Sequence, residues 1–90
     1  MSEVADNPAE HRFELVEDEQ TAFAAYRLDG DTITFTHTIV PRELEGHGVG
    51  SRLVGAALDD VRGRGLKVVA QCSFVAGYIE RHPDYNDLLA

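Results

Sequence analysis

Residues 31–61, DTITFTHTIVPRELEGHGVGSRLVGAALDDV, contain the change of hydrophobic period that decides the fold. In residues 31–40, apolar side chains alternate with threonines, which predicts a β-strand with one apolar face. We expect that face to hold Ile33, Phe35, His37 and Ile39. From residue 49 to residue 61 the apolar residues recur at helical spacing, so an amphipathic helix is expected there. A strand that leads through the glycine-rich residues 45–51 into a helix is typical of an α/β protein.

Further strands and one more helix flank this unit. Alternating patterns predict two strands, at residues 11–15 and 21–28, and Asp29-Gly30 predicts a hairpin into the next strand. The short apolar run 66–70 predicts a buried strand parallel to the one before the helix, and a second helix is expected over 74–81. The predicted order is β-β-β-α-β-α, a mixed and mostly antiparallel sheet with one parallel βαβ unit.

The composition argues against several classes of protein. The chain has 90 residues, which suits one domain, and its 8 Lys and Arg against 16 Asp and Glu give a formal charge of −8. Such an acidic balance argues against a nucleic-acid binder and against a polybasic membrane-surface protein. No apolar run approaches the length of a membrane span, and no signal-peptide pattern opens the chain. With a single cysteine and therefore no internal disulfide, we expect a cytoplasmic protein.

The acidic residues are concentrated near the start of the chain. Residues 1–10 show no periodic pattern and are expected to be a flexible tail, followed by a single domain over residues 11–90. Residues 1–20 hold seven of the acidic side chains and one arginine. We expect this acidic segment to lie away from the ligand-binding edge of the sheet.

The glycine-rich segment between the central strand and helix is a candidate phosphate site. Gly46, Gly48 and Gly50 leave their backbone amides unshielded, and the helix that follows adds free N–H groups and the positive end of its dipole. A P-loop is excluded because Ser51 and Arg52 follow the last glycine, and the spacing does not match a dinucleotide-binding fingerprint. The alternative interpretation is a flexible turn into a helix. The two parallel strands end at this same edge, where ligands of such sheets bind.

Gly46-His47-Gly48-Val49-Gly50-Ser51, followed by Leu53-Val54, resembles the acyl-CoA pyrophosphate loop of the GNAT superfamily of N-acetyltransferases. Residues 37–41, 72–74 and 78–85 resemble a short, single-domain branch of it, so the resemblance covers residues 11–90. It implies a compact GNAT-like fold, acetyl-CoA as the acyl donor, and a small amine or a protein lysine as the acceptor. It also implies the residues that hold the donor. These are Gly46, His47, Gly48, Val49, Gly50 and Ser51 for the pyrophosphate, and Thr38, Ile39 and Val40 for the acetyl and pantetheine portion.

Two positions depart from the pattern that the resemblance leads us to expect. The superfamily loop usually begins with arginine or glutamine where this chain has Glu45, and the branch usually carries an acidic residue where this chain has Ile39. The N-terminal helices that build the acceptor groove in longer relatives have no counterpart here. A CoA-binding module without turnover is therefore the alternative to an N-acetyltransferase.

Three residues are candidates for catalysis. Cys72 is expected beside the start of the second helix, which favours a thiolate, so it is either a nucleophile that carries the acetyl group or a buried small hydrophobe. Tyr78 best matches the tyrosine that protonates the leaving thiolate in GNAT enzymes, and the alternative is a core tyrosine. His37 is expected on the apolar face as a hydrogen-bonded core histidine, or else as a base for the incoming amine. The histidines and Cys72 lack metal-ligand spacing, so we expect no metal site.

Overall fold

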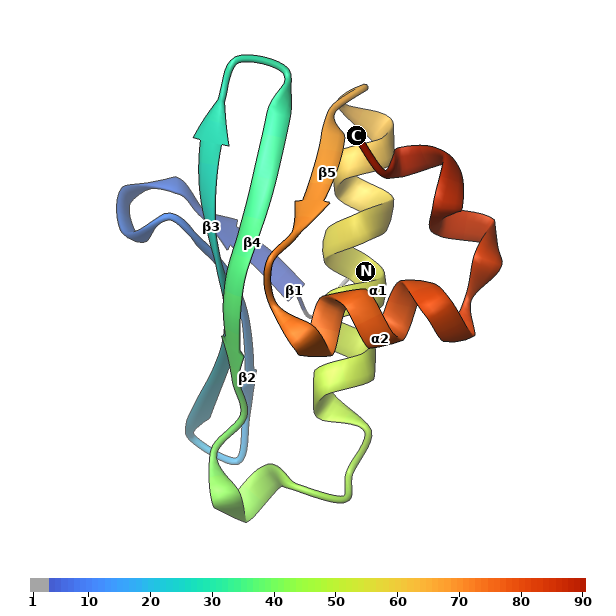
Figure 1. Ribbon diagram of the computed structural model, residues 1–90. Helices are drawn as coiled ribbons and strands as arrows, with labels where there is room; N and C mark the ends of the chain where they lie inside the picture. Colours follow the sequence, from blue (N-terminus) through green and yellow to red (C-terminus); the bar gives the residue numbers. More distant parts are fainter. Residues whose placement is uncertain (1–3) are drawn as a thin grey trace.

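The computed structural model of the protein describes residues 4–90. One five-stranded sheet runs in the order β1-β2-β3-β4-β5, antiparallel throughout except for the parallel pair β4 and β5 (Figure 1). The strands are β1 (Val4–Asn7), β2 (Arg12–Glu17), β3 (Gln20–Asp29), β4 (Thr32–Ile39) and β5 (Lys67–Ala70). Helix α1 (Val49–Gly63) connects β4 to β5, and α2 (Ser73–Arg81) follows β5. The described residues also form three short 3-10 helices, η1 (Pro8–Glu10), η2 (Arg42–Leu44) and η3 (Pro83–Leu88). The predicted α/β class, both helices and the parallel β4–α1–β5 unit are confirmed.

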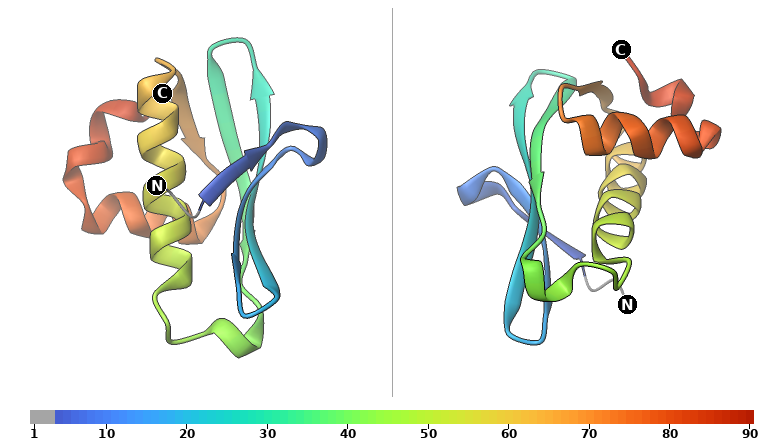
Figure 2. Two further views of the ribbon diagram at one scale, coloured as in Figure 1. Left: turned by 180° about the vertical axis from the view of Figure 1, so that it is seen from behind. Right: turned by 60° about the horizontal axis from the view of Figure 1, so that its bottom comes forward.

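Both helices cover the same face of the sheet (Figure 2). The apolar stripe of α1, which includes Leu53, Val54 and Leu58, is buried against side chains of the strands such as Leu15 and Phe35. Burial of these side chains is the main stabilising term for a domain of this size. No helix covers the opposite face in the described part of the chain (Figure 2). Among residues 4–90, no helix is both long and apolar enough to cross a membrane.

The predicted flexible tail over residues 1–10 is wrong for residues 4–10, and residues 1–3 lie outside the described residues. Val4–Asn7 form β1, which pairs antiparallel with β2, and η1 connects the two strands. The carboxylate of Asp6 accepts a hydrogen bond from the Tyr26 hydroxyl at 2.7 Å and forms a 2.8 Å ion pair with Arg64. This four-residue edge strand is too short and too polar to show hydrophobic alternation, so the sequence pattern did not predict it.

A β-bulge in β4 changes which side chains face the core. Tyr26 pairs with Phe35 and Ala25 pairs with His37, so Thr36 is an extra residue that is opposite no residue of β3 in the strand register. One inserted residue reverses the alternation of the residues that follow it. His37 and Ile39, predicted on the apolar face, are therefore exposed, and Ile39 has 47% of its surface accessible. Thr38 is half-buried instead.

Candidate functional site

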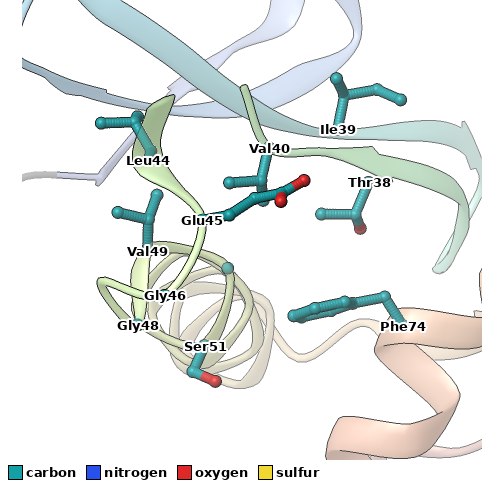
Figure 3. A pocket seen from close by; sticks show the side chains of 11 residues that line it. Thr38, Ile39, Val40, Leu44, Glu45, Gly46, Gly48, Val49, Ser51 and Phe74 are labelled. Carbon is teal, nitrogen blue, oxygen red and sulfur yellow. The ribbon is translucent and has the colours of Figure 1, made fainter. Parts of the chain in front are cut away.

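A cavity of about 530 Å³ lies between the end of β4 and the start of α1 (Figure 3). The glycine-rich loop forms one wall of it and the last residues of β4 form another, while Phe74 at the start of α2 lies opposite the loop. Its lining comprises Thr38, Ile39, Val40, Leu44, Glu45, Gly46, Gly48, Val49, Gly50, Ser51 and Phe74. Eight of the nine residues predicted to hold the acyl donor are in this lining, and the exception is His47.

The loop reaches α1 through two glycines with left-handed backbone. Gly46 has φ 85° and Gly48, the N-cap of α1, has φ 72°, a conformation that costs other residues about 1–2 kcal/mol. A Cβ added at either position would meet nothing within 4 Å, so the backbone is open to a ligand. The helical bonding begins with Arg52 N donating to Gly48 O at 3.0 Å, and no described side chain caps the helix. The N–H groups of the first turn are therefore available to an anion.

The opposite wall depends on a close approach between α1 and α2. A Cβ on Gly50 would lie 2.6 Å from the Phe74 ring, so only glycine fits at this position without moving the ring. Phe74 itself is 37% exposed. Sequence reasoning missed Phe74 and Leu44 as lining residues. Phe74 follows Ser73 at the start of the predicted helix, and its place next to the predicted strand end was the available signal.

Thr38 links the cavity to the buried cysteine. The hydroxyl of Thr38 lies 3.3 Å from the Cys72 Sγ, and Cys72 is only 6% exposed. Cys72 is the N-cap of α2, and its N–H donates to Phe35 O at the point where β5 ends. The predicted position of Cys72 beside the start of the second helix is confirmed, whereas its side chain is absent from the cavity lining.

His37 and Tyr78 lie outside this lining. His37 is on the face of the sheet away from the helices, where its ring makes an edge contact with Phe23 at 6.1 Å. Its predicted place in the core is wrong because of the bulge at Thr36. Tyr78 packs on α1 instead, since a Cβ on Gly55 would lie 2.6 Å from its hydroxyl. Its ring stacks on the His82 ring, with the two centroids 4.0 Å apart.

The environment of Tyr78 affects its acidity. Burial, with the nearby negative charge of Asp59, raises the pKa of Tyr78 above its usual value. A raised pKa keeps the phenol protonated at neutral pH and makes it a weaker proton donor. The packing against Gly55 and the raised pKa favour the core interpretation of this tyrosine.

The acidic β2–β3 turn borders the glycine-rich loop. Glu17 at the end of β2 accepts a hydrogen bond from Arg52 of α1 at 2.7 Å, and its second oxygen lies 3.6 Å from Nδ1 of His47. The hydrogen bond from Arg52 lowers the pKa of Glu17. The expectation that this acidic segment lies away from the ligand-binding edge is therefore wrong.

A second carboxylate belongs to the cavity itself. The side chain of Glu45 projects from the loop toward Val40 rather than away from the cavity (Figure 3). Within residues 4–90, no three His, Cys, Asp or Glu side chains are grouped so that they would hold a metal ion.

The comparisons with known proteins agree with this geometry. A family model described as GCN5-related N-acetyl-transferase matches residues 12–88. The chain belongs to the GCN5-related N-acetyltransferase family. An NMR structure of a GCN5-like proposed N-acetyltransferase from Staphylococcus aureus is similar to it, with 34% identity and a TM-score of 0.74. That similarity covers 99% of this chain and 88% of the Staphylococcus aureus chain, and no curated protein matches significantly.

GCN5-related N-acetyltransferases generally use acetyl-CoA, and the cavity fits such a ligand in two respects. The open backbone at Gly46 and Gly48 and the uncapped first turn of α1 suit a pyrophosphate. The half-buried end of β4 supplies an extended backbone and apolar side chains for the pantetheine chain. Glu45 is the feature that suits an anionic ligand least.

Proposed function

We propose that the protein is an acetyl-CoA-dependent N-acetyltransferase whose acceptor is an amine, either a small molecule or a protein lysine. The observation that carries this proposal is the cavity in which an open glycine loop at a helix N-terminus faces the end of β4. Family membership supports the reaction class, N-acetyl transfer. The identity of the acceptor amine is proposed in addition.

The divergence of the two parallel strands supports a place for the reacting thioester. β5 pairs with β4 only as far as Phe35 and Ala70, and the amides of Gln71 and Cys72 then both turn to Phe35 O. Beyond this point, no described strand lies beside β4 on that side. This free side of β4 supports a role for the backbone of Thr38, Ile39 and Val40 in hydrogen-bonding the pantetheine chain and the thioester oxygen.

Direct transfer is the route that the burial of Cys72 favours. In this route the acceptor nitrogen bonds to the acetyl carbon, the carbon–sulfur bond breaks, and the CoA thiolate takes up the proton that the amine loses. The other route passes through an acetyl-cysteine at Cys72, which the 3.3 Å contact with Thr38 brings near the site. Cys72 is 6% exposed and absent from the cavity lining, so its thiol is poorly placed to attack a bound thioester.

A second candidate function is a CoA-binding module without turnover. Glu45 in the cavity lining and the packing of Tyr78 against α1 favour it, because the first weakens anion binding and the second removes the expected proton donor from the site. Both functions require the same cofactor contacts. They differ only in release of the acetyl group.

One titration separates these two functions. Acetyl-CoA is added to the labelled protein while amide shifts are followed by NMR, and free CoA is measured with a panel of amines and a lysine peptide. We expect shifts at residues 46–51 and CoA release with at least one acceptor. Shifts without release would support the binding module, and unchanged amides at residues 46–51 would overturn both functions.

A pair of glycine variants tests the location of the donor. Gly50→Ala places a Cβ against the Phe74 ring at the cavity wall, so we expect at least tenfold weaker acetyl-CoA binding. Gly63→Ala at the end of α1 meets nothing within 4 Å and is the matched control. Equal affinities for the two variants would place the donor elsewhere.

A further inference from the structure

An ion-pair cluster joins the β2–β3 turn to the start of α1. Glu17 contacts Arg52 through one carboxylate oxygen at 2.7 Å and approaches Nδ1 of His47 with the other at 3.6 Å. The two basic residues belong to the loop and the first turn of α1, next to the lining residues Gly46 and Ser51. The three side chains are between 27% and 51% exposed, so a ligand from solvent can reach them.

The cluster brings the guanidinium of Arg52 to a place where the backbone already suits an anion. Arg52 is charged at every accessible pH and donates in a fork that fits phosphate as well as carboxylate. In this structure a carboxylate oxygen of Glu17 accepts a hydrogen bond from this guanidinium. A bound phosphate and Glu17 would compete for the same guanidinium.

We propose that Arg52 is a further cofactor-binding residue, which contacts a phosphate group of CoA, and that Glu17 is an internal competitor that lowers the affinity for CoA. This inference rests on the proposed function, since it concerns the same cofactor. It adds a residue pair that regulates affinity through the β2–β3 turn. The phosphate is either the pyrophosphate or the ribose 3′-phosphate, and both present the same chemistry to a guanidinium.

The size of the effect follows from the kind of ion pair. When a binding-competent state is only partly populated, apparent affinity falls by the populated fraction. Exposed ion pairs shift such equilibria modestly, so we expect removal of Glu17 to tighten CoA binding about three- to fivefold. A larger gain would require a buried pair, which the exposure of these side chains excludes.

The test compares four single variants and one double variant by calorimetric titration with CoA, each checked for a native NMR spectrum. Glu17→Gln removes the competitor, and Glu17→Asp keeps the charge while shortening the reach to Arg52. Glu19→Gln is the matched control, since it removes one negative charge from the same turn and leaves Glu17, the hydrogen-bond partner of Arg52, in place. Arg52→Gln, alone and with Glu17→Gln, tests whether the gain requires the guanidinium.

The inference predicts tighter binding in Glu17→Gln and Glu17→Asp, affinity within twofold of the wild type in Glu19→Gln, and no gain from Glu17→Gln once Arg52 is replaced. Repeating the series with dephospho-CoA locates the phosphate. If Glu17→Gln no longer binds more tightly than the wild type when dephospho-CoA is the ligand, Arg52 contacts the 3′-phosphate. If the gain in affinity persists with dephospho-CoA, Arg52 contacts the pyrophosphate. If the wild type binds CoA and Glu17→Gln binds it with the same affinity, or if Glu19→Gln gains as much affinity as Glu17→Gln, this inference is overturned and the proposed function is not. Absence of binding in every protein would overturn the proposed function with it.

Discussion

The hydroxyl of Thr38 lies 3.3 Å from the sulfur of Cys72, across the point where β4 and β5 separate. Thr38 lines the cavity and Cys72 does not, so the contact with Thr38 connects the thiol to the cavity. The bulge at Thr36 creates the relationship, because it turns Thr38 toward the helices and His37 away from them. An irregularity in the strand pairing thus decides which polar side chain of β4 faces the cavity.

Replacement of Cys72 by serine separates the two chemical routes. Serine can keep the contact with Thr38 but is a far weaker nucleophile than a thiolate at neutral pH. We expect Cys72→Ser to retain kcat for acetyl transfer to within about threefold, since direct transfer does not use the thiol. A loss of a hundredfold or more in kcat, with unchanged affinity for acetyl-CoA, would instead support the acetyl-cysteine.

The packing of Tyr78 against α1 predicts a rescue between two substitutions. Gly55→Ala would place a methyl group 2.6 Å from the Tyr78 hydroxyl, and overpacking of this kind costs about 1–3 kcal/mol. Tyr78→Phe removes the obstructing oxygen, so the double variant is expected to regain most of that stability. Urea unfolding of the two single variants and the double variant measures the coupling.

The same variants test the catalytic interpretation of Tyr78. If the phenol protonated the leaving thiolate, Tyr78→Phe would lower kcat by a factor of about 100 or more without changing affinity for acetyl-CoA. We expect kcat to change less than threefold, because the side chain lies outside the cavity lining. Strictly additive stabilities would contradict the packing account.

Local sequence patterns predicted most of the fold because they follow directly from side-chain burial. The alternation in residues 31–35 and the helical stripe from Val49 to Val61 each correspond to one apolar face against the core. β1 was not predicted from the sequence, because the bonds of its Asp6 are to Tyr26 and Arg64, which lie far along the chain. Such tertiary pairs leave no periodic signal.

The loop that lines the cavity was predictable for the same reason, whereas the positions of the candidate catalytic side chains were not. The spacing of the three glycines predicted a backbone that is open to a ligand. At Gly46 and Gly48 the structure has this open backbone. The face of the sheet on which His37 lies depends instead on a single inserted residue in β4. A bulge does not alter the sequence alternation, so His37 was assigned to the wrong face.

The turn between β2 and β3 contains two residues in an unfavourable backbone conformation. Asp18 and Glu19 have φ of 51° and 63°, and the turn closes a hairpin in which Glu17 pairs with Gln20. Asn-Gly is preferred in such two-residue turns, and left-handed backbone costs other residues about 1–2 kcal/mol each. We expect Asp18→Asn/Glu19→Gly to raise the free energy of unfolding by roughly 1–2 kcal/mol.

A charge control accompanies this stability measurement. The double variant also removes two negative charges from a chain of formal charge −8, which by itself lowers self-repulsion. Asp29→Asn/Asp31→Asn removes two charges beside the β3–β4 turn without relieving left-handed backbone at either residue. An equal gain in both double variants would attribute the effect to charge rather than to the backbone.

The three tyrosines predict how stability changes at high pH. Burial and a hydrogen bond to Asp6 raise the pKa of Tyr26 to about 12, and burial with a hydrogen bond to Asp59 raises the pKa of Tyr85 to about 12. The pKa of Tyr78 is raised as well. In the unfolded chain all three phenols ionise near pH 10.

Between pH 10 and pH 12 the unfolded chain therefore binds fewer protons than the native protein, and the free energy of unfolding falls as pH rises. Below pH 10 both states hold these protons, so the stabilisation is complete there. Phenolate absorbance measures the titration without interference, since the chain has no tryptophan. We expect native Tyr26 and Tyr85 to ionise only as the protein unfolds, and Tyr85→Phe to reduce the steepness of the alkaline loss. Native tyrosines that all titrate near pH 10, with no loss of stability, would contradict the hydrogen bonds to Asp6 and Asp59.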